Sequence, residues 1–167
     1  TTSVPLLTVR PAGIVPPAAS ITGRGSALAL DPAQNNTFRV INQAIATGAT
    51  IRYAPPTAAR GARYLVAGPN AQRIDSLAKS LWVSGERMNV ARNVTTAAVP
   101  ARIALYKASA GNMDQGWTEW LFDTHDFRYT LIGPADILDG NLGARFDVIV
   151  MASQGLTSAG RGGGRGG

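Results

Sequence analysis

The sequence of 167 residues contains no cysteine and only one histidine, His125. Without cysteine, the chain can form no disulfide framework, can offer no thiolate to a metal and has no thiol nucleophile. A catalytic zinc ion needs several protein ligands, which a single histidine does not supply. His125 lies in the sequence THDF, near the predicted end of a helix, with no His-x-x-Glu motif around it. We therefore expect no catalytic residue, no metal ligand and no cofactor in this chain, and His125 is expected to interact with the helix C-terminus.

Long apolar runs are also missing. A membrane-spanning helix needs roughly 18 or more consecutive apolar residues, and no run approaches that length, so no membrane span is expected. No segment combines a basic start, an apolar centre and a small-residue cleavage site, so we expect no signal peptide in these residues. Because the chain starts with Thr1 rather than methionine, we expect it to be a processed or trimmed piece of a longer protein.

Charged residues make up only 16% of the chain, yet the net charge is +6 and the isoelectric point is about 10.5. Such a surplus can indicate a polyanionic partner, but the arginines are scattered and lysine is scarce, which favours an ordinary solvated surface. Residues 160–167 contain only glycine and arginine. They resemble the RGG segments that bind single-stranded nucleic acid, but they cannot bury a core. We expect residues 153–167 to be a flexible loop or tail.

The first half of the chain predicts one small α/β unit. Residues 1–25 are rich in proline and predict an extended linker. Residues 26–93 follow the order strand, helix, strand, strand, helix, strand, with strands expected at residues 26–30, 49–55, 62–68 and 86–92. This βαββαβ order is typical of ferredoxin-like folds, and a Rossmann-like layout fits nearly as well.

Local signals place the ends of the two helices. Asn35 or Asn36 is the expected cap of the first helix, and Gly48 is expected to end it in a left-handed conformation. The second helix is predicted to start at Asn70 and to end at Gly85. The expected inner faces carry Phe38, Ile41, Ala44 and Ile45 in the first helix, and Ile74, Leu77, Ala78 and Leu81 in the second.

The second half predicts the start of a doubly wound, flavodoxin-like or amidotransferase-like α/β unit at residues 101–152, after a linker at 94–100. Strands are expected in ARIALY, RYTLI and DVIVM, the last covered on both faces. Asp114 is the expected cap of the intervening helix, whose Trp117 and Trp120 are expected to pack on the sheet. Three strands are too few for such a sheet. We therefore expect this chain to be a fragment whose missing strands come from another segment or chain.

The loop after the first of these strands is the candidate ligand site. Loops at the carboxyl ends of parallel strands bind ligands in doubly wound sheets. Lys107, Ser109, Asn112 and Asp114 could supply polar contacts, and the helix start at Gly116 could receive an anion. The alternative is that these residues only cap and turn the chain.

Two stretches of this half also carry a family resemblance: ARIALYKASAGNMDQGWTEWLFD, and DFRYTLIGPADILDGNLGARFDVIVMASQG. They resemble the segment downstream of the catalytic domain in large bacterial zinc carboxypeptidases of the carboxypeptidase A type. There the segment opens a domain similar to the class I glutamine amidotransferase fold. Amidotransferase activity is excluded here because its cysteine nucleophile is absent. The resemblance implies a scaffold, with zinc held elsewhere in the parent protein and a periplasmic or extracellular location.

The sequence therefore favours a non-catalytic accessory portion of a zinc carboxypeptidase-like exopeptidase, which supports or gates the catalytic domain. Its expected partner is that domain, or another fragment that completes the sheet. A basic RNA-binding module with an RGG tail is one alternative: Arg60, Gly61 and Tyr64 fit an RNA-recognition strand, but Ala62 and Ala67 stand where aromatic rings are needed. A small-ligand-binding α/β domain is another.

Overall fold

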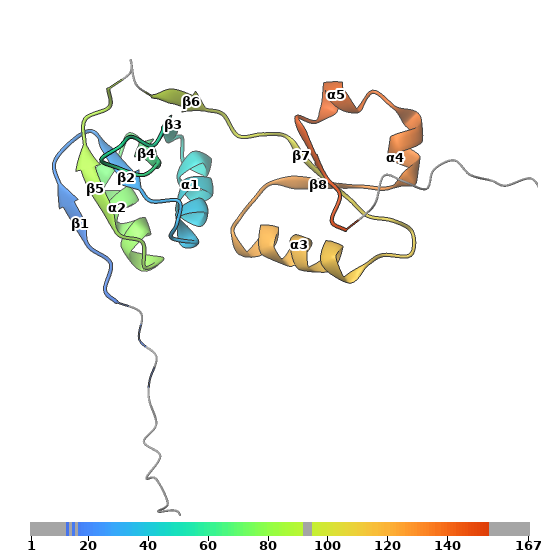
Figure 1. The fold of residues 1–167 in the computed structure, drawn as a ribbon, viewed down its shortest axis with the longest axis horizontal. Helices are drawn as coiled ribbons and strands as arrows, with labels where there is room; N and C mark the ends of the chain where they lie inside the picture. Colours follow the sequence, from blue (N-terminus) through green and yellow to red (C-terminus); the bar gives the residue numbers. More distant parts are fainter. Residues whose placement is uncertain (1–12, 14, 16, 92–94, 154–167) are drawn as a thin grey trace, which may run out of the picture.

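The computed structural model describes residues 13, 15, 17–91 and 95–153, which form two α/β units joined by an extended segment (Figure 1). The predicted α/β class is confirmed. The first unit, from β1 to β6, has a six-stranded sheet, and the second unit, from β7 to β9, has a three-stranded sheet. The glycine- and arginine-rich run at 160–167 lies outside the described residues. No helix in the described part of the chain combines the length and apolarity that a membrane crossing requires.

The first unit contains the elements expected between residues 26 and 93. These are β2 (Ala27–Leu30), α1 (Asn36–Ala46), β3 (Thr50–Ala54), β4 (Arg63–Ala67), α2 (Ala71–Ser80) and β5 (Gly85–Met88). Their strands are ordered β5-β2-β4-β3, and every neighbouring pair is antiparallel. A Rossmann-like layout is wrong for this unit, because it requires mainly parallel neighbours.

Two further strands extend this sheet at its edges. β1 (Ile21–Gly23) pairs in parallel with β5, and β6 (Thr96–Ala98) pairs antiparallel with β3. The sequence placed them in the linkers 1–25 and 94–100. Neither segment has the apolar pattern of a strand. Each joins an existing sheet edge through backbone hydrogen bonds, which the side-chain pattern does not reveal.

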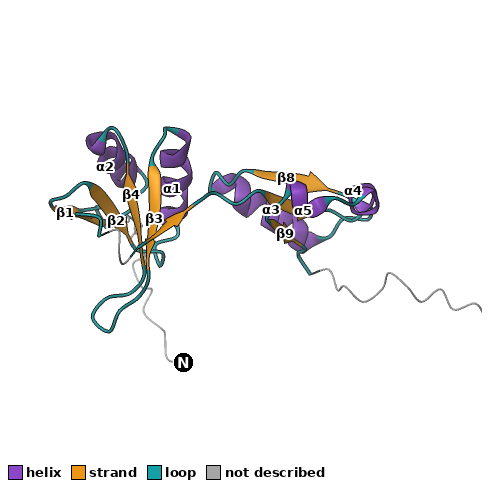
Figure 2. Ribbon diagram, turned by 90° about the horizontal axis from the view of Figure 1, so that it is seen from above, coloured by secondary structure: helices purple, strands orange, loops and turns teal. Residues whose placement is uncertain are grey.

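Both helices of the first unit cover the same face of the sheet (Figure 2). The buried cluster under them contains Leu28, Leu30, Val40, Ile41, Ala44, Ile51, Val66, Ile74, Ala78 and Val83. Phe38 and Ile45, which the periodicity of α1 also assigned to its inner face, are only half-buried. They lie at the side of the unit that faces the second one.

Two of the predicted helix ends are confirmed. The side chain of Asn70 accepts a hydrogen bond from the backbone N–H of Arg73 at 2.9 Å, as an N-cap does. Gly48 follows α1 with a φ of 85°, and its N–H donates to the carbonyl of Ile45. Both residues act within one turn of chain, so local chemistry was enough to predict them.

Two other helix ends differ from the prediction. Asn35 occupies the N-cap position of α1, as predicted, but its backbone is helical and its side chain makes no capping bond. Asn36 donates from Nδ2 to the Leu81 carbonyl, 2.8 Å away. The helix α2 ends at Ser80, and Gly85 instead begins β5. Trp82, which lies between these two elements, takes the left-handed conformation with a φ of 60°. Asn36 is held by a contact with the end of α2. The end of α2 itself is a local turn, in which the N–H of Val83 donates to the carbonyl of Ala78 at 2.9 Å.

The second unit contains the three predicted strands: β7 (Ile103–Tyr106), β8 (Tyr129–Ile132) and β9 (Val148–Val150). Its helices are α3 (Met113–Thr124), α4 (Pro134–Asp139) and α5 (Leu142–Arg145). The sheet order is β8-β7-β9 with parallel neighbours. The short helices α4 and α5 occupy the connection for which the sequence predicted no regular structure.

An ion pair at the amino ends of β7 and β9 holds these two strands in register. The guanidinium of Arg102 lies 2.7 Å from Oδ1 of Asp147, and the Arg102 backbone N–H donates to Oδ2 at 2.8 Å. These hydrogen bonds from Arg102 lower the pKa of Asp147 to about 2. Folding therefore stabilises the charged form of the Asp147 carboxylate relative to its protonated form.

This ion pair predicts a defined dependence of stability on pH. Because the folded-state pKa of Asp147 lies below its unfolded value, its contribution is present above about pH 4 and is lost as the pH falls towards 2. Asp147→Asn should lower the thermal midpoint at pH 7, and the difference from the wild type should vanish over that range. Asp139→Asn is the matched control, because the side chain of Asp139 makes no ion pair or hydrogen bond with any described residue. A pH-independent difference for Asp147→Asn would contradict the assignment.

Candidate functional site

The predicted ligand loop lies at the carboxyl edge of the three-stranded sheet. It follows β7 directly, and the loops after β8 and β9 leave from the same edge because the strands are parallel. The Nδ2 of Asn112 donates to the carbonyl of Ala152 at 3.2 Å, which joins the loop after β7 to the loop after β9. The location is therefore that of ligand sites in doubly wound sheets.

The polar groups of this loop are mostly engaged with one another. The Nζ of Lys107 is 3.9 Å from Oε2 of Glu119, which also accepts a hydrogen bond of 2.6 Å from Nε2 of Gln115. Gln115 is only 4% exposed, and its backbone N–H donates to Oδ1 of Asn112 at 2.6 Å. A ligand would have to displace these contacts. Sequence reasoning missed Gln115 and Glu119, although their spacing of four residues is that of neighbours on a helix face.

Two predicted roles in this loop are wrong. Asn112 caps α3, and Asp114 lies in the first turn, where its charge is favourable at the helix N-terminus without capping it. The helix begins at Met113 rather than at Gly116, whose N–H donates to the carbonyl of Asn112 at 3.2 Å and is not available to an anion. Ser109 is exposed on the loop. The sequence alone could not separate Asn112 from Asp114, since both residue types are good caps.

Among the described residues, nothing requires glycine at position 116. A Cβ there would have no atom outside its own helix within 4 Å, and its φ lies outside the left-handed region. Gly116→Ala should therefore stabilise the chain by about 0.5–1 kcal/mol, measured by urea unfolding, because alanine loses less backbone entropy in a helix. Gly111→Ala is the control: its surroundings are equally open, but its φ of +64° should make alanine destabilising. A loss of stability in Gly116→Ala would show that this position needs glycine.

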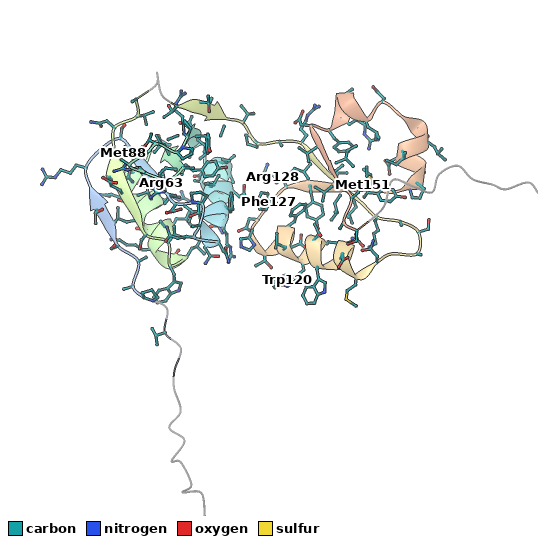
Figure 3. The ribbon with its side chains drawn as sticks, viewed as in Figure 1. Arg63, Met88, Trp120, Phe127, Arg128 and Met151 are labelled. Carbon is teal, nitrogen blue, oxygen red and sulfur yellow. The ribbon has the colours of Figure 1, made fainter. Side chains whose placement is uncertain are left out.

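The outer face of α3 is an exposed apolar stripe, which we call the tryptophan stripe. It consists of Met113, Trp117, Trp120 and Leu121, which are 77%, 62%, 58% and 46% exposed. The two indoles touch edge to face, 5.9 Å between ring centroids, and Figure 3 shows Trp120 on the outer side of the helix. The expectation that they pack on the sheet is wrong. The face of α3 that carries Gln115 and Phe122 packs inward instead, with Phe122 against Tyr129 of β8.

β9 is also exposed, contrary to the prediction that both its faces are covered. Val148 and Ile149 are 44% and 38% exposed. The strand pairs with β7 on one side, and among the described residues no strand pairs with its other side. We call this side the open edge of β9. Unpaired backbone groups beside apolar side chains make such an edge ready to accept another strand.

The residues that RNA binding or a metal site would require are engaged in other contacts. Tyr64, which an RNA-binding surface would need on an open sheet face, packs edge to face on Phe38 of α1 with ring centroids 5.9 Å apart. His125 ends α3, and its Nδ1 lies 3.1 Å from the carbonyl of Leu121. No group of three or more histidine, cysteine or acidic side chains suited to a metal ion occurs within the described ranges.

Comparisons of the chain with models of protein families, with curated proteins and with solved structures returned no match. The fold and the site thus define a class, an α/β protein with an open parallel sheet edge.

Proposed function

We propose that this chain is a non-catalytic accessory portion of a zinc carboxypeptidase-like exopeptidase, and that its second unit docks on another polypeptide segment. The docking surface is the open edge of β9, where a strand of that segment adds to the sheet. The observation that carries the proposal is the exposure of Val148 and Ile149 on an edge strand of a parallel sheet.

Strand addition suits this edge for a physical reason. Parallel strands are ordinarily buried on both faces, and an exposed apolar edge strand tends to associate. A strand added beside β9 would satisfy its free backbone groups. Val148 and Ile149 point to opposite faces of the sheet, so the docking segment would cover them with one element on each face. The segment that docks is either the catalytic domain of the same protein or another fragment of it.

The resemblance supports the same assignment. The two stretches that carry it span the whole second unit, from β7 through β9. By this resemblance, the parent protein removes C-terminal residues from peptides, its zinc is held outside this chain, and it acts in the periplasm or outside the cell. This chain would support the catalytic domain or restrict access to it.

Hydrogen exchange of the β9 backbone, in this chain alone and in the natural protein that contains it, tests the proposal. The amide of Ile149 should exchange about 100-fold more slowly in the natural protein, as an amide does on entering a stable ladder, whereas the amide of Val148 already donates to the carbonyl of Arg102 in this chain. The amides of β7 are an internal control, because this strand is paired on both sides in the isolated chain. Ile149→Lys should abolish the added protection, and Thr130→Lys on β8 should not.

Equal exchange of β9 in the two proteins would overturn the docking surface. Hydrolysis of a peptide with a C-terminal phenylalanine or leucine by this chain alone, with zinc added, would overturn its non-catalytic role. Binding of an oligonucleotide whose affinity falls steeply with salt would favour an RNA-binding module instead.

A further inference from the structure

A cavity of about 360 Å³ lies between the two units. It is lined by the face of α1 that carries Phe38, Ile41 and Ile45, and by Ile103 of β7 and Phe127 from the second unit. The rings of Phe38 and Phe127 are neighbours, with centroids 6.4 Å apart. Residues 98–101, which connect the two units, line it as well. The lining is therefore mainly apolar. Its volume falls at the lower end of the range for small-molecule sites, which often form between domains.

The turn between α3 and β8 forms the polar rim of this cavity, and most of its polar groups are already satisfied. Oδ2 of Asp126 accepts hydrogen bonds from Nε of Arg39 at 2.9 Å and from Nε2 of Gln43 at 2.8 Å. These bonds, with that from Gln43 the stronger cause, lower the pKa of Asp126. Asn42 donates from Nδ2 to the carbonyl of His125 at 2.9 Å. The same contacts hold α1 to the second unit.

Arg128 is the exception on this rim. Its side chain lines the cavity and makes no ion pair or hydrogen bond with any described residue. Figure 3 places Arg128 and Phe127 between the two units. The nearby carboxylate of Asp126 is neutralised by Arg39, and that of Asp123 accepts a hydrogen bond from the hydroxyl of Tyr129 at 2.9 Å. The cavity therefore combines an apolar interior with one unpaired positive charge at its rim.

We propose that this cavity binds a small apolar carboxylic acid. An aryl or alkyl chain would fill the space between Ile41, Ile45 and Ile103, and the carboxylate would pair with the guanidinium of Arg128. A guanidinium pairs with a carboxylate through two parallel hydrogen bonds, which fixes the orientation of the ligand. The apolar lining excludes a highly charged ligand such as a nucleotide, because its other charges would be buried without partners.

Titration of the whole chain with 3-phenylpropionate, followed by NMR of ¹³C-labelled isoleucine methyl groups, tests the proposal. The methyl signals of Ile41, Ile45 and Ile103 should shift and saturate at ligand concentrations below about 1 mM, a modest affinity for one ion pair and one small ring. The methyl signal of Ile149, which does not line the cavity and points to the face of the second sheet opposite Ile103, should not move. The neutral 3-phenylpropionamide and the cationic 3-phenylpropylamine should bind at least about tenfold more weakly than the acid, because they lack its negative charge.

Two variants separate the contribution of the Arg128 charge to binding from that of the cavity volume. Arg128→Gln should weaken binding of the acid about tenfold and leave the amide unchanged. Arg73→Gln, an exposed arginine of α2 away from the cavity, is the matched control and should bind as the wild type does. Ala101→Trp should block acid and amide alike, because the indole fills the cavity while Arg128 is kept.

The proposal is overturned if the acid, the amide and the amine bind equally. Shifts confined to residues outside the cavity, or the absence of saturation up to about 10 mM, would overturn it too. Because Ile149 does not line the cavity and points to the face of the sheet opposite Ile103, Ile149→Lys should not alter binding of the acid. Failure of the docking proposal would therefore leave the proposal of a carboxylic acid site intact.

Discussion

Asp75→Ala is expected to destabilise the chain by about 3 kcal/mol, since it leaves the guanidinium of Arg87 buried without its counter-charge. The Arg87 side chain is 8% exposed, and its Nη2 lies 2.6 Å from Oδ1 of Asp75, which also accepts from Nε at 3.0 Å. A charge taken out of water is stabilised only by a close partner. Removing that partner therefore costs much more than an exposed ion pair contributes.

The buried guanidinium of Arg87 keeps one unsatisfied hydrogen-bond donor even when Asp75 is present. Nη2 also donates to the carbonyl of Ala71 at 2.5 Å, but Nη1 is buried and has no partner among the described residues. Replacing the whole pair should therefore be less harmful than breaking it. In the double variant Asp75→Ala/Arg87→Met the charge is gone, and we expect it to recover about half of the loss.

Urea unfolding at pH 7 measures these effects, with the free energy of unfolding extrapolated to water. Glu86→Ala is the matched control: it removes a carboxylate from an ion pair with Arg60 whose side chains are 48% and 45% exposed, and it should change stability by less than about 1 kcal/mol. If Asp75→Ala were no worse than Glu86→Ala, or if the double variant were less stable than Asp75→Ala, the buried charge would not be the cause.

Gly85→Ala is expected to destabilise the chain by about 2–3 kcal/mol, because a Cβ at this position overlaps the neighbouring strand. It would lie 2.8 Å from Cδ1 of Leu28, 2.9 Å from the carbonyl oxygen of Ala29 and 3.0 Å from Cδ2 of Leu30. Both leucines are fully buried, and the carbonyl belongs to a central strand, so none of the three can move without disturbing the core.

The same measurement on Gly61→Ala provides the control. A Cβ at Gly61 would meet only the end of the Arg63 side chain, at 3.4 Å, so its effect should stay within about 0.5 kcal/mol. A Gly85→Ala variant as stable as Gly61→Ala would mean that β5 can retreat from β2, and that close strand packing does not explain this glycine.

The parts of the fold that the sequence predicted are those decided by neighbouring residues. Asn70 caps α2 and Gly48 ends α1 through bonds within a single turn. The strands β2, β4 and β7 contain compact apolar runs. In each case the side chains needed for the assignment lie within about ten residues of one another, where propensity and periodicity apply.

The candidate site was predicted less well. The loop from Lys107 to Gly116 does lie at the carboxyl edge of a parallel sheet, as the order of elements implied. Its internal bonds were not foreseen, because the contacts of Asn112 with Ala152 and of Lys107 with Glu119 depend on how the loop closes. The tryptophans of α3 match a buried pattern and are exposed, since periodicity shows which residues share a face but not which face meets the sheet.

The sequence by itself determined the α/β class, most of the strands and two helix ends, because these depend on short-range backbone chemistry and on the spacing of apolar residues. Only the tertiary structure decided that β1 and β6 join the sheet, that Gly85 lies against β2, and that Arg87 meets Asp75. It also brought Arg128 to the rim of an apolar cavity formed by residues far apart in the chain. Contacts of this kind depend on the packing of whole elements, which no local pattern encodes.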